Sequence, residues 1–261
     1  MKFFNDVGFL VSNYGIDFLR GLGYTLLISL ISTVIGLIIG LIIGVIRTMP
    51  KSKNKMGRFF RKILDFLLSA YVEIFRGTPM MVQAMVIYWG YAFASGGNTL
   101  NLIFAGILIV SINTGAYMAE IVRGGIMSID KGQFEGANAI GMTHFQTMRY
   151  IILPQVLKNI LPSVSNEFVI NIKDTSVLNV IGVTELYFFA KVTVKETFLT
   201  FPCYFIICVM YFIVTFTITR LLRLLEKKLS GKKNYKIQGS QNLDAISIVK
   251  EEQEGVFNIN E

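Results

Sequence analysis

Uncharged stretches along the chain predict repeated crossings of a lipid bilayer. Residues 23–46 contain no charged side chain and end at Arg47, and residues 197–219 are also uncharged. A helix rises about 1.5 Å per residue, so about 20 apolar residues cross the hydrocarbon core of a membrane. We therefore predict a first span over 23–46 and a last span over about 197–224.

Three more spans are predicted between these two. Residues 77–119 are uncharged but too long for one crossing, and the turn signal at 95–98 (Ser-Gly-Gly-Asn) divides them. This places a second span at about 63–93 and a third at about 100–120. Residues 150–172 are interrupted by two prolines and two charged residues, which predicts a shorter, kinked fourth span. The expected fold is an all-α integral membrane protein with five transmembrane helices.

The composition agrees with a membrane protein and excludes several enzyme classes. Hydrophobic residues make up 53% of the chain and charged residues only 16%, whereas soluble domains carry about a quarter charged residues. The single histidine, His144, leaves no His-based metal cluster and no Ser-His-Asp arrangement, and the two cysteines lie in an apolar run. We therefore predict no catalytic site, no metal site and no disulfide scaffold.

The basic residues predict the orientation in the membrane. Segment 47–62 has seven basic residues and no acidic one, and segment 220–236 has seven against Glu226. With five spans both segments fall on one face, which the positive-inside rule assigns to the cytoplasm of a plasma-membrane protein. The net charge of +8 then indicates topology and attraction to anionic lipid, with no need for nucleic acid.

This orientation divides the chain into three parts. Residues 1–22 are predicted to be an extracytoplasmic N-terminal segment, and Asp6 and Asp17 within them argue against a signal peptide. Residues 23–225 form the membrane domain, with a loop at about 124–149. Residues 226–261 are predicted to be a mobile cytoplasmic tail, because the composition becomes polar and acidic after Lys236.

The loop at 124–149 carries signals for two short helices. Asp130 is placed to cap a helix that Gly141 would end, and Thr143 with Gln146 has the spacing of a capping box. Such a knob would expose the apolar side chains Phe134, Ile140, Met142 and Phe145 and suits docking to a partner. The alternative is an amphipathic hairpin that lies on the lipid surface.

The same loop contains a motif of a known family. Glu135-Gly136-Ala137, followed by Gly141 and then, after nine residues, by Ile151-Ile152-Leu153-Pro154, resembles the EAA signature of ABC importer permeases. Gly136 replaces the second alanine, which is a small-for-small change. Blocks at 73–79, 117–125, 132–133 and 173–177 are similar, in order, to the polar amino-acid uptake branch. The similarity covers roughly residues 20–225.

The resemblance implies a type I importer permease with five transmembrane helices. It further implies a second permease subunit, either another copy or a related chain, two cytoplasmic ATP-binding subunits and an extracytoplasmic amino-acid-binding protein. The loop is then expected to contact the ATPase and to couple its closure to the membrane helices. The residues expected to take part are Phe134, Glu135, Gly136, Ala137, Gly141 and Phe145. For Glu135, a hydrogen bond within the loop is the alternative to partner contact.

The sequence lacks the Gly-rich phosphate cradle of P-loop ATPases. We therefore expect no cofactor in this chain, and we expect ATP and Mg²⁺ to bind the partner ATPase.

Ionisable groups at membrane depth are costly and indicate function by default. Glu73 with Arg76, next to Pro79, and Glu120 with Arg123 have i, i+3 spacing and are expected to brace helices. The motif residues Lys173 and Asp174 are assigned to the same structural group. Glu167 has no opposite charge within one turn. It is therefore the candidate for binding a substrate ammonium group, together with Asn166 and Asn113; the alternative is an interhelical hydrogen bond.

These observations favour the membrane subunit of an ATP-driven importer of polar amino acids, without catalytic activity of its own. The alternatives are a self-sufficient secondary transporter or channel and a membrane scaffold. Five spans without self-similarity argue against the first alternative, and the ordered polar motifs argue against the second. Basic, amide-bearing, acidic and sulfur-containing amino acids all remain compatible with the sequence.

Overall fold

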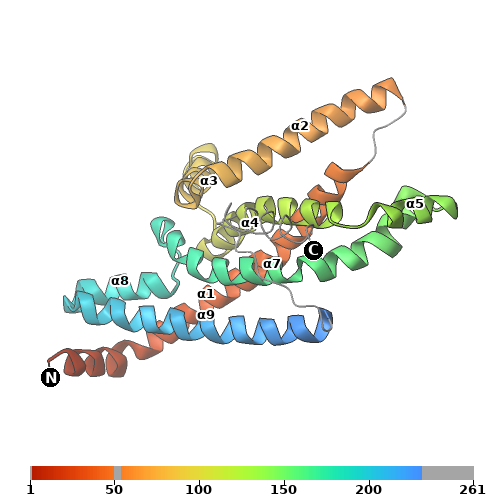
Figure 1. The fold of residues 1–261 in the computed structure, drawn as a ribbon. Helices are drawn as coiled ribbons and strands as arrows, with labels where there is room; N and C mark the ends of the chain where they lie inside the picture. Colours follow the sequence, from red (N-terminus) through yellow and green to blue (C-terminus); the bar gives the residue numbers. More distant parts are fainter. Residues whose placement is uncertain (1, 50–53, 231–261) are drawn as a thin grey trace, which may run out of the picture.

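The computed structural model describes residues 2–49 and 54–230, and this part of the chain is helical, without a strand. Figure 1 shows the long helix α1 running the length of the molecule, with α4, α7, α8 and α9 packed along it. The elements in chain order are α1 (Lys2–Thr48), α2 (Lys55–Gly77), α3 (Met80–Ala94), α4 (Leu102–Met127), α5 (Lys131–Ala139), α6 (His144–Thr147), the π-helical turn η1 (Met148–Ile152), α7 (Leu153–Asp174), the 3₁₀ turn η2 (Thr175–Ile181), α8 (Leu186–Thr197) and α9 (Thr200–Ser230).

These helices correspond to the predicted spans. Helices α1, α4 and α9 are each long and apolar enough to cross a membrane, and the segment 144–181, bent by 52° from α8, counts with it as a fourth candidate. The second predicted span is the pair α2–α3, in which α3 is apolar but only 15 residues long. The all-α fold is therefore confirmed.

The helices run past two of the predicted domain boundaries. Residues 2–22 are helical and continue into the first span without a break, because α1 is continuous from Lys2 to Thr48. Leu10 and Phe18 are buried in this part of α1, where they pack with residues of α8 and α9, and that packing extends the helix. Helix α9 likewise continues past the predicted boundary at 225 to Ser230, and the rest of the predicted tail lies outside the described residues.

The second span is broken rather than merely bent. Thr78 has extended backbone angles (φ −120°, ψ 149°) and ends α2, and α3 begins at Met80. Pro79 has no backbone N–H, and its ring disfavours helical geometry at the preceding residue, so the helix cannot continue through it. The turn predicted at 95–98 is confirmed, since Gly96 and Gly97 have φ values of 69° and 101°.

A stripe of glycines brings α1 into close contact with α4. Gly36, Gly40 and Gly44 face Thr114, Met118 and Val122 in turn, at intervals of four residues on both helices. The two helices therefore run parallel over this length. Side chains of α4 fill the space that side chains at the α1 glycines would occupy. Small residues at this spacing allow backbones to approach closely within a membrane.

Candidate functional site

The loop between α4 and α7 forms the capped helices that its sequence predicts. The carboxylate of Asp130 accepts a hydrogen bond from the N–H of Gly132 at 2.7 Å at the start of α5. Gly141 has a φ of 77°, and the N–H of Met142 donates to the carbonyl of Ala137 at 3.0 Å. This is the hydrogen bond of a Schellman helix end, which favours glycine because φ is positive. Thr143 and Gln146 complete the predicted capping box of α6.

One face of α5 packs inward. Phe134 is half-buried against a cluster that includes Val122, Ile126 and Ile152, and Ala137 is only 2% exposed. The expectation that Phe134 is an exposed docking side chain was therefore wrong, and Ala137 offers no surface to a partner. Residues three apart lie on the same helix face, so both anchor α5 to the membrane helices.

The opposite face of α5 is open. Glu135 and Gly136 are exposed, and so are Ile140 at the end of α5, which keeps 76% of its surface exposed, and Phe145 of the following helix α6, which keeps 68%. Among the described residues the carboxylate of Glu135 has no hydrogen bond or ion pair, so the alternative of a bond within the loop has no support in this structure. Two large apolar side chains beside a free carboxylate suit a protein contact.

The α5–α6 loop is rigidly joined to α7. Helix α6 does not end as a separate element but continues through the π-helical turn η1 into α7. The amide of Gln155 on α7 lies 3.3 Å from Gln133 of α5, and a Cβ on Gly125 of α4 would lie 2.4 Å from Ile160 of α7. A displacement of the loop would therefore be passed on to α4 and α7.

A buried polar triad joins three membrane helices. The amide nitrogen of Asn171 on α7 donates to the hydroxyl of Thr33 on α1 at 2.8 Å. The amide oxygen of Asn171 accepts from the hydroxyl of Thr114 on α4 at 3.0 Å. Sequence reasoning missed Asn171, although its position one turn beyond Glu167 was a possible signal.

The three substrate-path candidates do not meet in one place. Glu167 is 4% exposed and has a polar interaction of its own, so it is not the unpaired carboxylate that the sequence suggested. Asn166, its neighbour on α7, lines a cavity of about 80 Å³ that also borders α9. Asn113 of α4 instead bonds to residues at the α2–α3 break.

At that break, amide side chains satisfy the carbonyls that the interrupted helix leaves free. Gln83 donates to the carbonyls of Phe75 and Thr78, each at 2.9 Å, and accepts from Asn113 at 2.9 Å. Asn113 also donates to Phe75 at 3.2 Å. Asn113 therefore holds the break in place, and Gln83 is a structural residue that sequence reasoning missed.

The pair expected between Glu73 and Arg76 is not formed. No ion pair within 4.0 Å joins the two in the described part of the chain, and both are exposed. The Arg76 guanidinium instead lies over the ring of Tyr117 on α4, 5.4 Å from its centroid. This cation–π contact stabilises the Arg76 guanidinium close to the point where α2 ends before Pro79.

The pair expected between Glu120 and Arg123 is formed, at 2.8 Å. Glu120 also pairs with Arg47 at the end of α1, and Arg47 lies 3.3 Å from the hydroxyl of Ser69 on α2. Arg47 is thus part of a polar network that links α1, α2 and α4. The sequence indicated only its role in setting the orientation in the membrane.

Lys173 and Asp174 lie in the last turn of α7 and are not an ion pair within 4.0 Å among the described residues. The Lys173 side chain is exposed and lines cavities beside α9, so the structure does not place it with the bracing residues.

Comparison with known proteins gives consistent matches. Residues 36–231 match the family described as binding-protein-dependent transport system inner membrane component. The glutamine transport system permease protein GlnP of Escherichia coli (strain K12) is 36% identical over 167 residues, which cover 64% of this chain and 76% of that protein. A putative GlnP of Rickettsia bellii (strain RML369-C) is 38% identical over 177 residues, covering 68% of this chain and 79% of that protein.

Solved structures share the fold. A crystal structure of an amino acid ABC transporter with histidines has a chain that is 37% identical, with a TM-score of 0.73, over 84% of this chain and 97% of that chain. An inward-facing MetNI methionine ABC transporter has a TM-score of 0.66 at 20% identity, which supports the fold alone.

Proposed function

Because the chain belongs to the family of binding-protein-dependent transport system inner membrane components, it is the permease subunit of an ATP-driven importer, and we propose that it carries polar amino acids. Relatives above 30% identity include glutamine permeases and an amino acid transporter, so L-glutamine is the first substrate to test. In this family a separate ATPase subunit hydrolyses ATP, which supports an ATP-driven importer over a self-sufficient secondary transporter or a scaffold.

An importer of this kind works with an ATPase and a binding protein. We propose in addition that two ATPase subunits bind two permeases, either two copies of this chain or one copy with a related chain. ATP and Mg²⁺ would bind the ATPase and not this chain. The two basic segments support an orientation with the α5–α6 loop in the cytoplasm, the N-terminus outside and the C-terminus inside.

The exposed face of α5 is proposed as the ATPase contact, and the observation that carries this proposal is the division of α5 into two faces. Phe134 packs on the α4–α7 core and Ala137 is buried, while Glu135 of α5, Ile140 at its end and Phe145 of α6 are left exposed. Gly141 supports this geometry because its positive φ turns the chain between α5 and α6. A contact on this face would move α4 and α7 together.

The substrate path is proposed to pass along the side of α7 that carries Asn166. Asn166 borders a cavity, whereas Glu167 is buried and already has a polar interaction, and Asn113 of α4 is bonded to Gln83 of α3. Glu167 is assigned to holding α7 against its neighbours in this conformation, and its direct contact with substrate is the alternative that the Glu167→Gln variant tests.

Mass spectrometry of the intact complex tests the proposed function. The tagged permease, purified from its native membrane in mild detergent, should carry an ATPase subunit, with a mass that fits two permeases and two ATPases. Uptake of labelled L-glutamine, L-arginine, L-glutamate and L-methionine by vesicles from the same cells then identifies the substrate class. A permease that purifies without an ATPase would contradict the proposal.

A further inference from the structure

The first half of α2 carries a row of basic side chains beside an apolar face. Lys55, Arg58 and Lys62 are spaced three and four residues apart, so they lie on one side of the helix, and all three are exposed. The adjoining side has large apolar side chains that keep between 43% and 68% of their surface exposed, namely Met56, Phe59, Phe60, Ile63 and Leu67. We call these two groups together the amphipathic face of α2.

Arg61 fixes the depth of this face in the membrane. Its guanidinium donates to the backbone carbonyl of Ile46, the last residue of the uncharged first span. Further along α2, Tyr71 donates to the carbonyl of Ile112 in the middle of α4 at 2.6 Å, so α2 runs into the membrane from Arg61 onward. Lys55 lies about 9 Å from Arg61 in the other direction, whereas the headgroup layer is only about 5–8 Å thick on each side. The amphipathic face therefore crosses the headgroup layer.

The row of basic side chains has no anionic partner in this segment. The side chains of Lys55, Arg58 and Lys62 make no ion pair or hydrogen bond with another residue of the part of the chain that the structure describes. Arg61, by contrast, pairs with Asp65 at 2.8 Å. Because residues 47–64 contain no acidic residue, a partner for these three cations has to come from outside the segment.

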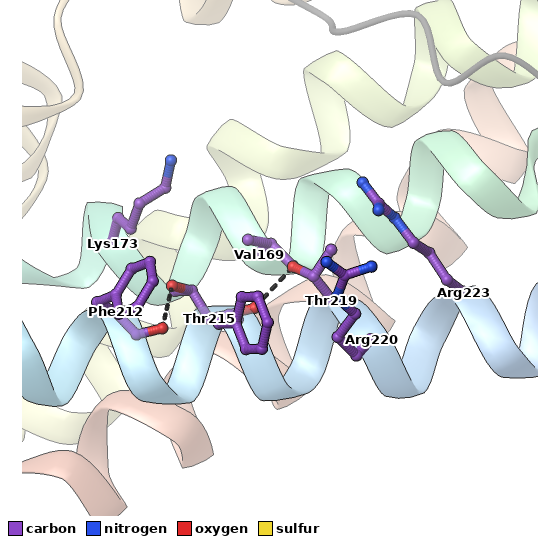
Figure 2. Close-up of a pocket in the computed structure, with 8 residues that line it drawn as sticks. Val169, Lys173, Phe212, Thr215, Thr219, Arg220 and Arg223 are labelled. Carbon is purple, nitrogen blue, oxygen red and sulfur yellow. Dashed lines mark hydrogen bonds between the residues drawn. The ribbon is translucent and has the colours of Figure 1, made fainter.

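Basic side chains on α9 are placed differently. Figure 2 shows Lys173, Arg220 and Arg223 beside a cavity of about 230 Å³ between α7 and α9. Arg220 also lies over the ring of Phe216, 5.0 Å from its centroid. Figure 1 shows α2 at the edge of the molecule instead, on the far side of α4 from α9. The amphipathic face of α2 is therefore open to the surrounding membrane.

We propose that the amphipathic face of α2 binds anionic phospholipid in the cytoplasmic leaflet. The phosphate of a headgroup such as phosphatidylglycerol pairs with the basic row, and the acyl chains cover Phe59, Phe60 and Leu67. Aromatic and leucine side chains beside basic ones are typical of helices at the boundary between headgroups and acyl chains, where apolar burial and attraction to anionic lipid add up. This inference rests on the orientation that is part of the proposed function.

Bound lipid also has a route to the α5–α6 loop. Arg61 joins the first half of α2 to the end of α1. Arg47 at that end pairs with Glu120 of α4, and α4 leads into the loop. Lipid that holds α2 in place would therefore support the coupling of the ATPase to the membrane helices, and ATP-driven uptake should be faster when anionic lipid is present.

Two protein occupants fit this face less well. In a symmetric contact between two copies of the chain, the same surface of each copy meets its equal, so two basic rows would lie together and repel each other. The ATPase lies in the cytoplasm, but the apolar side chains continue at the same spacing from Leu67 to Ile74, which lies beyond Tyr71 and is 56% exposed. A cytoplasmic protein does not reach that depth.

The test places the photoreactive residue p-benzoylphenylalanine at position 60 of α2. The permease–ATPase complex is assembled in vesicles of equal parts phosphatidylglycerol and phosphatidylcholine and irradiated, and mass spectrometry identifies the crosslinked molecule. Each basic residue near an anionic lipid contributes about fivefold in affinity. Phosphatidylglycerol adducts should therefore outnumber phosphatidylcholine adducts about tenfold or more. With Lys55→Gln/Arg58→Gln/Lys62→Gln the ratio should fall close to the one-to-one composition of the vesicles.

Two control variants make the result specific. Lys55→Arg/Arg58→Lys/Lys62→Arg changes the same three positions but keeps their charge, and it should keep the enrichment. Lys191→Gln/Lys195→Gln removes two exposed cations from α8, far from α2, and should also keep it. Arg58→Gln alone should lower the ratio about fivefold and Arg58→Lys should not, which keeps the proposal testable if the triple glutamine variant does not assemble.

Several outcomes would overturn the inference. Adducts with a second permease or with the ATPase would assign the face to a protein contact, and an unchanged ratio in the glutamine variants would exclude recognition by charge. An equal loss in the charge-keeping triple variant would reduce the basic row to packing. Uptake of labelled L-glutamine that is equally fast with and without phosphatidylglycerol would remove the link to coupling. Since crosslinking needs no substrate, normal enrichment in a complex that imports no amino acid would contradict the proposed function and leave the lipid site standing.

Discussion

Met118 of α4 occupies the space that a side chain on Gly40 of α1 would need. A Cβ on Gly40 would lie 2.3 Å from the Cβ of Met118, closer than packed side chains allow. The backbones of the two helices are therefore in contact, and the glycine fixes how α1 lies along α4. Since α4 leads into the α5–α6 loop, this contact ties the longest membrane helix to the element that is proposed to meet the ATPase.

Gly40→Ala should destabilise the permease. Overpacking of a close helix contact typically costs about 1–3 kcal/mol, so the midpoint of thermal unfolding in detergent should fall by several degrees. Gly23→Ala is the matched control on the same helix, because a Cβ at that position meets nothing within 4 Å. Equal midpoints for both variants would show that the α1–α4 contact is looser than described.

The amino-acid pattern predicted elements well where local chemistry decides the structure. The cap at Asp130, the positive φ of Gly141 and the break at Pro79 follow from the residues themselves. The helical N-terminal part of α1 did not follow, because its stability comes from packing with α8 and α9, which are distant in sequence.

The candidate site shows the same contrast between features set by local sequence and features set by packing with distant residues. That α5 forms was predictable, but which of its faces is exposed depends on the α4–α7 core that holds Phe134. The side-chain partners of charged residues were predicted poorly, because a sequence shows the i, i+3 pairs within one helix and not the contacts between helices. Arg76 instead lies over Tyr117 of another helix, and Glu120 recruits Arg47 in addition to Arg123.

Glu167→Gln tests the two roles of the buried carboxylate. Because Glu167 is 4% exposed and already engaged, we expect the variant to lower the thermal stability of the assembled complex while uptake per complex stays within about twofold of wild type. Size-exclusion chromatography with thermal challenge and uptake normalised to assembled complex measure these quantities. Normal stability with a roughly tenfold loss of uptake would instead assign Glu167 to substrate binding.

Gly141→Val should uncouple the loop. A β-branched side chain is strongly disfavoured at a φ of 77°, so the turn between α5 and α6 should distort while the membrane helices remain intact. The variant should reach the membrane in normal amounts, but ATPase co-purification or substrate-stimulated ATP hydrolysis should fall about tenfold. Gly124→Ala, near the end of α4 and outside the proposed contact face, is the control for a change beside the loop, because a Cβ there meets nothing within 4 Å. Wild-type coupling in Gly141→Val would exclude this turn from the mechanism.

The orientation can be measured by cysteine labelling. In a Cys208→Ser background, Thr99→Cys should react with a membrane-impermeant maleimide added to intact cells, and Lys55→Cys should react only after the membrane is opened. Both positions are exposed, and Thr99 is a better choice than Gly97, whose φ of 101° a cysteine would strain. The reverse pattern of labelling would overturn the assignment of the basic segments to the cytoplasm.

ATP-driven uptake by purified components tests the central claim most directly. The permease and its ATPase are reconstituted into liposomes with ATP in the lumen, and the binding protein and labelled L-glutamine are added outside. Accumulation should require all three proteins and ATP hydrolysis, and L-arginine, L-glutamate and L-methionine in parallel assays would define the range of substrates. Accumulation by the permease alone, driven by an ion gradient without the ATPase, would contradict the account.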